Sequence, residues 1–388
     1  MVAETSVNAV TFGYAASHRA PVSAPRACVA PPSRSCKTAS MRDLAALPKA
    51  HLHLHFTGSM KPESVAELAD QYNVRLPGAV LETEDAVMLP PTSRGWFRFQ
   101  RLYDAARACV RGEADMRRVV DEAAAGDAAV GGGRMEIQVD PTSYAPFVGG
   151  ITPALEIILD EAKSASARHG ISVGVIVAAS RMRHPLEARV LARLAAKYAG
   201  DADGEVVGFG LSNDERQGRT SEFAPAFAIA QRAGLISVPH GGELLGADHV
   251  EVVLDKLAPQ RLGHGVRALE DPRLVDRLLE ADVALEVNPA SNVSLGVFED
   301  ITKVPLAELY DTGLKIALGS DDPLLFKSRL NEQYEIARNV HGFSDDQLAR
   351  LALDSIAAST AREETKKTMR SGVAAWLSDD SAGNPDGK

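Results

Sequence analysis

Residues 50–57 read AHLHLHFT, and this stretch is the first of eight short β-rich runs in the chain. Histidine alternates here with an apolar residue, which is the period-2 pattern of a β-strand. Stretches with the 3.6-residue period of amphipathic helices lie between the runs, for example residues 152–170 and 186–200. Strands that alternate with helices along a chain predict a parallel β-sheet.

Eight strand–helix units predict an α/β fold that closes into a (β/α)8 TIM barrel. An open, doubly wound sheet is the alternative, but neither GxGxxG nor GxxxxGK follows the first run. The expected strands are residues 50–56, 134–140, 171–179, 205–211, 235–240, 261–265, 283–289 and 315–321.

Polar residues concentrate at the C-terminal ends of these runs, and TIM-barrel enzymes build their active sites at that face. Most runs are apolar until their last residues. The polar residues are His53, His55, Gln138, Asp140, residues 212–215, His240, His264, Asn288, Asp321 and Asp322. We therefore expect the functional site among them.

The connection between the first two runs, residues 57–133, is far longer than a usual βα loop. It predicts a helical insertion at about residues 60–132. Within it, GWFRFQRLYDAARACV at 95–110 has apolar residues on one helical face. These are Trp96, Phe99, Tyr103, Ala106 and Val110. This helix either packs on the barrel rim or forms a lid whose aromatic side chains cover a substrate and exclude water.

The three histidines of the first run cannot all bind one metal ion. Residues two apart on a strand face the same way about 6.6 Å apart, so two imidazoles can converge on an ion, but three would span about 13 Å. His53 and His55 lie nearer the C-terminal end, and His51 is expected to be a hydrogen-bonded core residue.

Two further strand ends supply matching metal ligands. His240 closes the fifth run, in SVPHGGE, and Asp321 closes the eighth, in ALGSDDP. Three imidazoles and one carboxylate suit zinc, because magnesium and calcium prefer oxygen ligands. The hypothesis is therefore one Zn2+ per chain, bound by His53, His55, His240 and Asp321.

Five segments, spread over roughly residues 46–345, resemble the signature segments of the adenosine deaminase family and occur in the same order. They are PKAHLHLHFTGS, VPHGGE, RLGHGVRALEDP, LEVNPASN and LGSDDPLLF. The resemblance implies a zinc-dependent hydrolase of purine metabolism, which replaces the 6-amino group of a purine nucleoside and releases ammonia.

The resemblance also implies residue roles. The four proposed zinc ligands match the family's ligands. Glu243 corresponds to the proton donor, His264 to the histidine that orients and deprotonates the attacking water, and Asp322 to the carboxylate that engages the purine. The positions expected to face the substrate are His55, Thr57, Asn213 and Asp322. Without the resemblance, Glu243 could be a helix N-cap, His264 a turn residue and Asp322 a helix-start residue.

The reaction itself requires residues of these types. Hydrolytic deamination needs an activated water at C6, a proton on ring nitrogen N1 and a proton for the departing ammonia. Zinc would activate the water, and a carboxylic acid whose pKa is raised by an enclosed site would protonate N1. Glu243 follows His240 by three residues, and Gly241 and Gly242 are expected to leave room for the purine.

Two positions depart from the family pattern. Thr57 stands where the family usually has an acid that binds the ribose 5′-hydroxyl, and Asn213, in LSNDE, replaces a glycine that contacts the purine. Because Thr57 does not demand a free 5′-hydroxyl, three substrates remain. Adenosine ranks first, a 5′-modified adenosine such as the aminodeoxyfutalosine of an alternative menaquinone route second, and adenine third.

Other classes of protein fit less well. A catalytically silent zinc- or nucleoside-binding protein would not need both Glu243 and His264. Amidohydrolases that open cyclic amides normally carry a bridging lysine at the end of the fourth strand, which LSNDE lacks. The PCxxC motif that cytidine-type zinc deaminases combine with HxE is also absent from the sequence.

Composition restricts the partners. The 388 residues are 45% apolar with a net charge of −10, and they lack the Lys/Arg blocks that bind nucleic acid. No apolar run approaches the roughly 18–20 residues of a membrane span, so we expect a soluble protein. Cys28, Cys36 and Cys109 show neither disulfide nor metal-site spacing, which suits a reducing compartment. The oligomeric state stays open, and a homo-oligomer is compatible with the sequence.

Residues 1–40 differ in composition from the rest of the chain. They are rich in Ala, Ser, Pro and Val, with four Lys/Arg residues and one acid. This predicts either a transit peptide for plastid or mitochondrial import, or a disordered extension before a start at Met41 in an intracellular, cytoplasmic protein. We expect the deaminase barrel at 41–378 and a solvated tail at 379–388.

Overall fold

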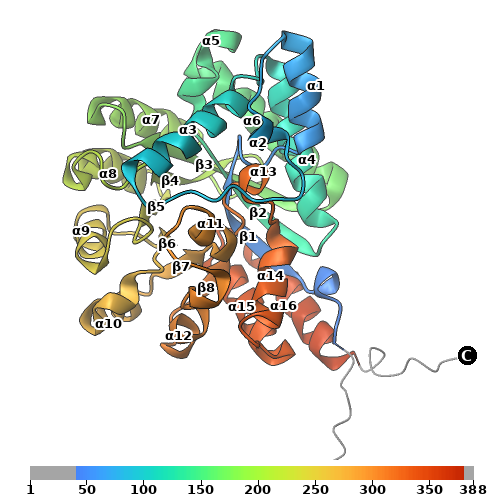
Figure 1. Ribbon diagram of the computed structural model, residues 1–388, viewed down its shortest axis with the longest axis vertical. Coiled ribbons are helices and arrows are strands. Elements are labelled where there is room, and N and C mark those ends of the chain that lie inside the picture. Colours follow the sequence, from blue (N-terminus) through green and yellow to red (C-terminus); the bar gives the residue numbers. More distant parts are fainter. Residues whose placement is uncertain (1–40, 380–388) are drawn as a thin grey trace, which may run out of the picture. The chain divides into compact units, whose positions relative to one another are not determined.

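The computed structural model describes residues 41–379, so the extension expected at 1–40 and the tail residues 380–388 lie outside the described residues. Eight parallel strands follow one another in chain order, from β1 to β8. β8 returns to β1, because the Asp321 N–H donates to the His53 carbonyl oxygen and the His55 N–H donates to the Asp321 carbonyl oxygen, each at 3.0 Å. The predicted (β/α)8 barrel is confirmed, with helices around the sheet (Figure 1).

The strands are β1 (Lys49–His55), β2 (Gly132–Val139), β3 (Ser172–Ser180), β4 (Val206–Ser212), β5 (Ile236–Gly241), β6 (Arg261–His264), β7 (Ala284–Val287) and β8 (Ile316–Leu318). Each overlaps its predicted run. The last two are shorter than expected: α11 begins at Pro289, whose ring nitrogen carries no hydrogen for a strand ladder, and the backbone at Asp321 has a positive φ of 60°.

The helices of the insertion and the first half of the barrel are α1 (Pro62–Tyr72), α2 (Gly78–Leu81), α3 (Ser93–Arg107), α4 (Glu113–Ala128), α5 (Ala145–Val148), α6 (Ile151–His169), α7 (Pro185–Lys197) and α8 (Ala224–Arg232). Those that follow are α9 (Ala247–Leu257), α10 (Pro272–Glu280), α11 (Pro289–Ser294), α12 (Leu306–Asp311), α13 (Pro323–Phe326), α14 (Leu330–Asn339), α15 (Asp345–Ala358) and α16 (Glu363–Ser378). None of these helices is long and apolar enough to cross a membrane.

Local sequence explains several helix ends. Proline occupies the first position of α1, α7 and α10, where its fixed φ suits a helix start. α6 ends at Gly170, as predicted, because glycine accepts the left-handed φ of 69°. α15 starts with a capping box in which Ser344 and Gln347 satisfy each other's backbone N–H groups.

The long connection between β1 and β2 contains α1 to α4. α4 packs against α6 and β2, as an outer helix of the barrel does, although it lies within the stretch predicted as an insertion. α3 instead contributes Trp96, Phe99 and Tyr103 to a cavity at the C-terminal ends of the strands.

Charged side chains fill much of the barrel interior nearer the N-terminal ends of the strands. Arg134 Nε lies 3.1 Å from Glu136 Oε1, and Arg261 reaches Glu136 Oε2 at 2.6 Å and Glu286 Oε1 at 2.7 Å. All four are buried. Burial alone would raise the pKa of Glu136, but Arg261 and Arg134 lower it to about 2. A Cβ on Gly174 would lie 2.2 Å from Arg134 Nη2, so glycine makes room for this arginine.

We expect Arg261→Met to lower the free energy of unfolding by about 3–5 kcal/mol, because it leaves two buried carboxylates without their shared cation. Chemical denaturation of chelator-treated protein measures this without a contribution from metal. Arg277→Met is the matched control, since Arg277 pairs with Glu251 and Asp255 on the surface. Equal unfolding free energies for the two variants would contradict the role given to Arg261.

Candidate active site

Four predicted metal ligands converge at the C-terminal end of the barrel. His53 and His55 end β1, His240 lies in β5, and Asp321 follows β8. His55 Nε2 lies 3.2 Å from His240 Nε2 and 3.1 Å from Asp321 Oδ1, which is 3.4 Å from His53 Nε2. The ligand atoms of all four residues lie within 4.8 Å of one another. They can therefore surround one ion.

The acidic surroundings of His53 fit a cation at this position. Its Nδ1 lies 2.7 Å from Glu286 Oε2, which orients the ring, while its buried Nε2 has no hydrogen-bond partner within residues 41–379 and is free to bind an ion. Burial would lower the pKa of His53, but the nearby carboxylates of Asp321 and Glu286 raise it to about 10. The environment thus favours positive charge, and three imidazoles with one carboxylate form a donor set suited to zinc.

His51 takes no part in this group. Its Nδ1 lies 2.7 Å from Asp127 Oδ2, and its Nε2 accepts from the Ser320 N–H at 3.2 Å. It is the hydrogen-bonded core histidine that the strand period predicted.

His264 and Asp321 have a left-handed backbone, which the sequence did not reveal. φ is 67° at His264 and 60° at Asp321. Such conformations cost about 1–3 kcal/mol for non-glycine residues and persist where the surrounding structure enforces them. They end β6 and redirect the chain after β8, so both side chains enter the site.

Glu243 is buried next to His264. Its Oε1 lies 3.7 Å from His264 Nε2. Burial, followed by the charges of Asp321 and Glu215, raises the pKa of Glu243 well above its ordinary value. Burial lowers the pKa of His264 to about 3. Both shifts favour the uncharged form, a carboxylic acid at Glu243 and a neutral imidazole at His264.

The second nitrogen of His264 faces two amides. Nδ1 lies 3.3 Å from Asn288 Nδ2 and 3.2 Å from Asn292 Nδ2. Asn292 Oδ1 has no partner among the described residues, so the amide can rotate and present this oxygen to Nδ1–H. In that tautomer His264 Nε2 is a proton acceptor.

The surroundings of Asp322 also favour its uncharged form. Burial and the neighbouring Asp321 raise its pKa well above the ordinary value, and its Oδ1 has no hydrogen-bond partner within residues 41–379. Asp322 lines the cavity, so a protonated carboxyl group is available to a ligand.

The sequence analysis gave no role to the two residues that hold the loop at 240–245, which contains Glu243. Glu215 accepts hydrogen bonds from the backbone N–H groups of Glu243 at 3.3 Å and of Leu244 at 2.8 Å. Arg181 Nη2 donates to the carbonyl oxygen of His240 at 2.7 Å. The only signal for Glu215 was its place at a strand end, where it was grouped with other polar residues.

The two glycines of this loop serve packing and backbone geometry. A Cβ at Gly241 would lie 2.9 Å from Leu262 Cδ1, and one at Gly242 would lie 2.7 Å from Val250 Cγ2. Gly242 also has φ of 74°. The expectation that these glycines leave room for the purine is therefore wrong, because both missing side chains would collide with the barrel's own packing.

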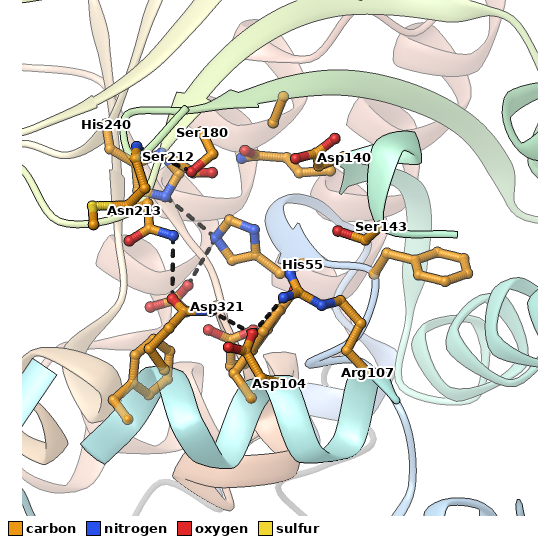
Figure 2. Close-up of a pocket in the computed structure, with 18 of the residues that line it drawn as sticks. His55, Asp104, Arg107, Asp140, Ser143, Ser180, Ser212, Asn213, His240 and Asp321 are labelled. Carbon is orange, nitrogen blue, oxygen red and sulfur yellow. Dashed lines mark hydrogen bonds and ion pairs between the residues drawn. The ribbon is translucent and has the colours of Figure 1, made fainter. Parts of the chain in front are cut away.

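A cavity of about 310 Å³ opens above the metal-ligand group. Its inner end is lined by His55, His240, Glu243, His264, Asp321 and Asp322. Its outer end includes the partly or largely exposed polar side chains of Asp104, Arg107, Asp140, Ser143, Ser180, Arg183 and Ser212. Figure 2 labels all of these residues except Arg183.

The two positions that depart from the family pattern differ in their access to the cavity. Thr57 is fully buried and does not line it; its Oγ1 lies 2.5 Å from the hydroxyl of Tyr144, which does. Asn213 lines the cavity, but its side chain is hydrogen-bonded to Trp96 and Gln100 of α3.

Comparison with known proteins agrees with the arrangement of the metal-ligand group and the cavity. The family description "Adenosine deaminase" matches residues 48–376. The chain belongs to the adenosine deaminase family. Over 336 residues it is 56% identical to "Putative adenosine/adenine deaminase" of Streptomyces virginiae, a match that covers 87% of this chain and 98% of the relative. The chain is thus an adenosine/adenine deaminase-type hydrolase with a His/His/His/Asp metal site.

Solved structures of this deaminase fold agree. The adenine deaminase from Arthrobacter aurescens has a TM-score of 0.77 and 29% identity, covering 85% of this chain and 99% of the other. An amidohydrolase from Burkhoderia ambifaria, with bound Zn, has a TM-score of 0.74 and 25% identity, covering 87% of this chain and 91% of the other.

We expect His240→Ala to lower the zinc content of the purified protein from about one ion per chain to a small fraction, because a structural imidazole ligand is lost. Elemental analysis after dialysis measures this. His184→Ala is the control: His184 caps α7, and its Nδ1 accepts from the Leu186 N–H. Full zinc occupancy in the His240 variant would remove this residue from the ligand set.

Proposed function

We propose that this deaminase converts adenosine to inosine and ammonia, with one zinc ion held by His53, His55, His240 and Asp321. The observation that supports adenosine is the polar outer end of the cavity. A purine at the metal-ligand end would place its N9 substituent toward that outer end, where hydroxyl and carboxylate side chains can bind ribose. A free base would not reach these groups.

The charges at the outer end favour an uncharged ribose over a phosphorylated one. Arg107 is paired with Asp104, while Arg183 lies 3.8 Å from Asp140 and 3.2 Å from Glu187. Because each cation already has a carboxylate partner, a 5′-phosphate would meet acidic oxygens beside each arginine. We therefore expect AMP to be a poor substrate.

Zinc, when bound, supplies a Lewis acid that lowers the pKa of water toward about 7 and so makes a nucleophile available at neutral pH. His264 Nε2 is the acceptor for the proton that the attacking water loses. Glu243, whose pKa is raised by burial, donates a proton to purine N1 as C6 is attacked. The C6–N bond then breaks, the amino group takes the proton held by His264 and leaves as ammonia, and Glu243 regains a proton from the new C6 hydroxyl. Asp322, whose pKa is raised and which lines the cavity, donates a hydrogen bond to the purine and so orients the ring.

Adenine is the second candidate. The covered position of Thr57 supports it, because no acid at this position meets a ribose 5′-hydroxyl, and one structural relative is an adenine deaminase. A 5′-modified adenosine such as aminodeoxyfutalosine is the third, since the cavity is open at its outer end.

A substrate panel tests the assignment. Ammonia release is measured with zinc-loaded protein and adenosine, adenine, AMP, 5′-methylthioadenosine or aminodeoxyfutalosine. We expect the highest kcat/KM for adenosine. A higher value for adenine would transfer the assignment to the free base, and no turnover of any compound would overturn the deaminase proposal.

We expect Glu243→Gln to keep its zinc and to lose about 10²–10⁴ of kcat, because the amide cannot supply the proton. The raised pKa of Glu243 also predicts that wild-type kcat/KM falls as the pH rises through that pKa, since only the protonated form donates. Glu251→Gln, on the surface of α9, is the control. Near-wild-type turnover in the Glu243 variant would exclude it as the donor.

A further inference from the structure

We propose that Asn213 is a positioning residue that latches α3 over the cavity, and that it does not act by contacting the purine. α3 is called the lid helix below. The inference rests on the proposed function, because the cavity is taken to be the catalytic one. It gives a role to a residue that departs from the family pattern.

The side-chain amide of Asn213 is largely committed to the lid helix. Its Oδ1 accepts a hydrogen bond from Trp96 Nε1 at 3.2 Å, and its Nδ2 donates to Gln100 Oε1 at 3.1 Å. The same Oδ1 also accepts from the backbone N–H of Asp214 at 2.8 Å. One amide at the end of β4 therefore grips two residues that lie one helical turn apart.

The backbone conformation of Asn213 also indicates that its side chain is there to bind the lid helix. φ is 81°, in the left-handed region that glycine occupies without strain and that asparagine tolerates better than most residues. A glycine would fit this turn at least as well. The asparagine is thus explained by what its side chain binds, and both of its side-chain partners belong to the lid helix.

The latch continues along the lid helix to the outer end of the cavity. Gln100 Nε2 donates to Asp104 Oδ1 at 2.8 Å, and Arg107 pairs with the same oxygen. Figure 2 labels Asn213, Asp104 and Arg107 of this chain of contacts beside the cavity. Asn213 therefore sets the position of the polar face of the helix.

An apolar contact holds another side of the lid helix. The ring of Phe99 stacks on Phe326 of α13, with centroids 5.6 Å apart and an angle of 13° between the planes. Phe326 lies four residues after Asp322. The polar latch at β4 and the stacked rings at α13 together keep Trp96, Phe99 and Tyr103 over the cavity.

Asn213→Gly tests the latch, because glycine accepts the backbone conformation and removes both bonds to the lid helix. We expect KM to rise roughly tenfold, the loss expected for about one net hydrogen bond, with kcat within about threefold of wild type. Asn73→Gly is the matched control, since Asn73 also has a positive φ, of 51°, at the end of α1. It should leave both parameters unchanged.

Tryptophan fluorescence without substrate tests whether Asn213 positions the lid helix or instead acts only by contacting the purine. The chain has two tryptophans, Trp96 and Trp376, so the difference spectrum against Trp96→Phe isolates Trp96. In Asn213→Gly we expect red-shifted Trp96 emission and stronger acrylamide quenching. Unchanged emission and quenching would overturn the latch, and a loss confined to kcat would instead assign Asn213 to the purine. This readout needs no turnover, so it stands even if the substrate panel fails.

Discussion

The backbone pairing between β1 and Asp321, three residues after the end of β8, is the constraint on which the site depends. Asp321 exchanges hydrogen bonds with His53 and His55, and these two bonds close the barrel. The same pairing sets three metal ligands side by side, because the two histidines flank the residue opposite Asp321. The same hydrogen bonds therefore close the sheet and assemble the metal site, and a shift of register between β1 and Asp321 would separate the ligands.

Nearer the N-terminal ends of the strands, charged side chains occupy much of the barrel interior. Arg261 lies between Glu136 and Glu286, and Glu286 in turn orients His53. A buried ion pair brings little net stability compared with apolar residues, but removal of one partner is costly. The network thus fixes the direction of the His53 ring, which a core of aliphatic side chains could not do.

At the metal-ligand end of the barrel, burial and the contacts of neighbouring residues separate the pKa values of the acids of the site. Asp321 faces three imidazoles, and although burial alone would raise its pKa, hydrogen bonds with His53 and His55 hold that pKa well below the ordinary value. Glu243 and Asp322 lie near this anion in the same buried region, and their pKa values are raised. One carboxylate is therefore suited to bind a cation and two carboxylic acids to donate hydrogen, which is the division that purine deamination requires.

The sequence by itself determined the barrel, the order of its strands and the residues at their C-terminal ends, because strand and helix periods are local and the ends of parallel strands meet at one face. It also distinguished His51 from His53 and His55, since that distinction follows from strand geometry. Only the tertiary structure decided how the remaining side chains are used. The partners of Glu286, Glu215 and Asn213 lie far from them in sequence, and no local period records such contacts. Packing around Tyr144 covers Thr57 and the lid helix engages Asn213, so the two residues whose identity departs from the family were placed by neighbours that the sequence pattern does not reveal.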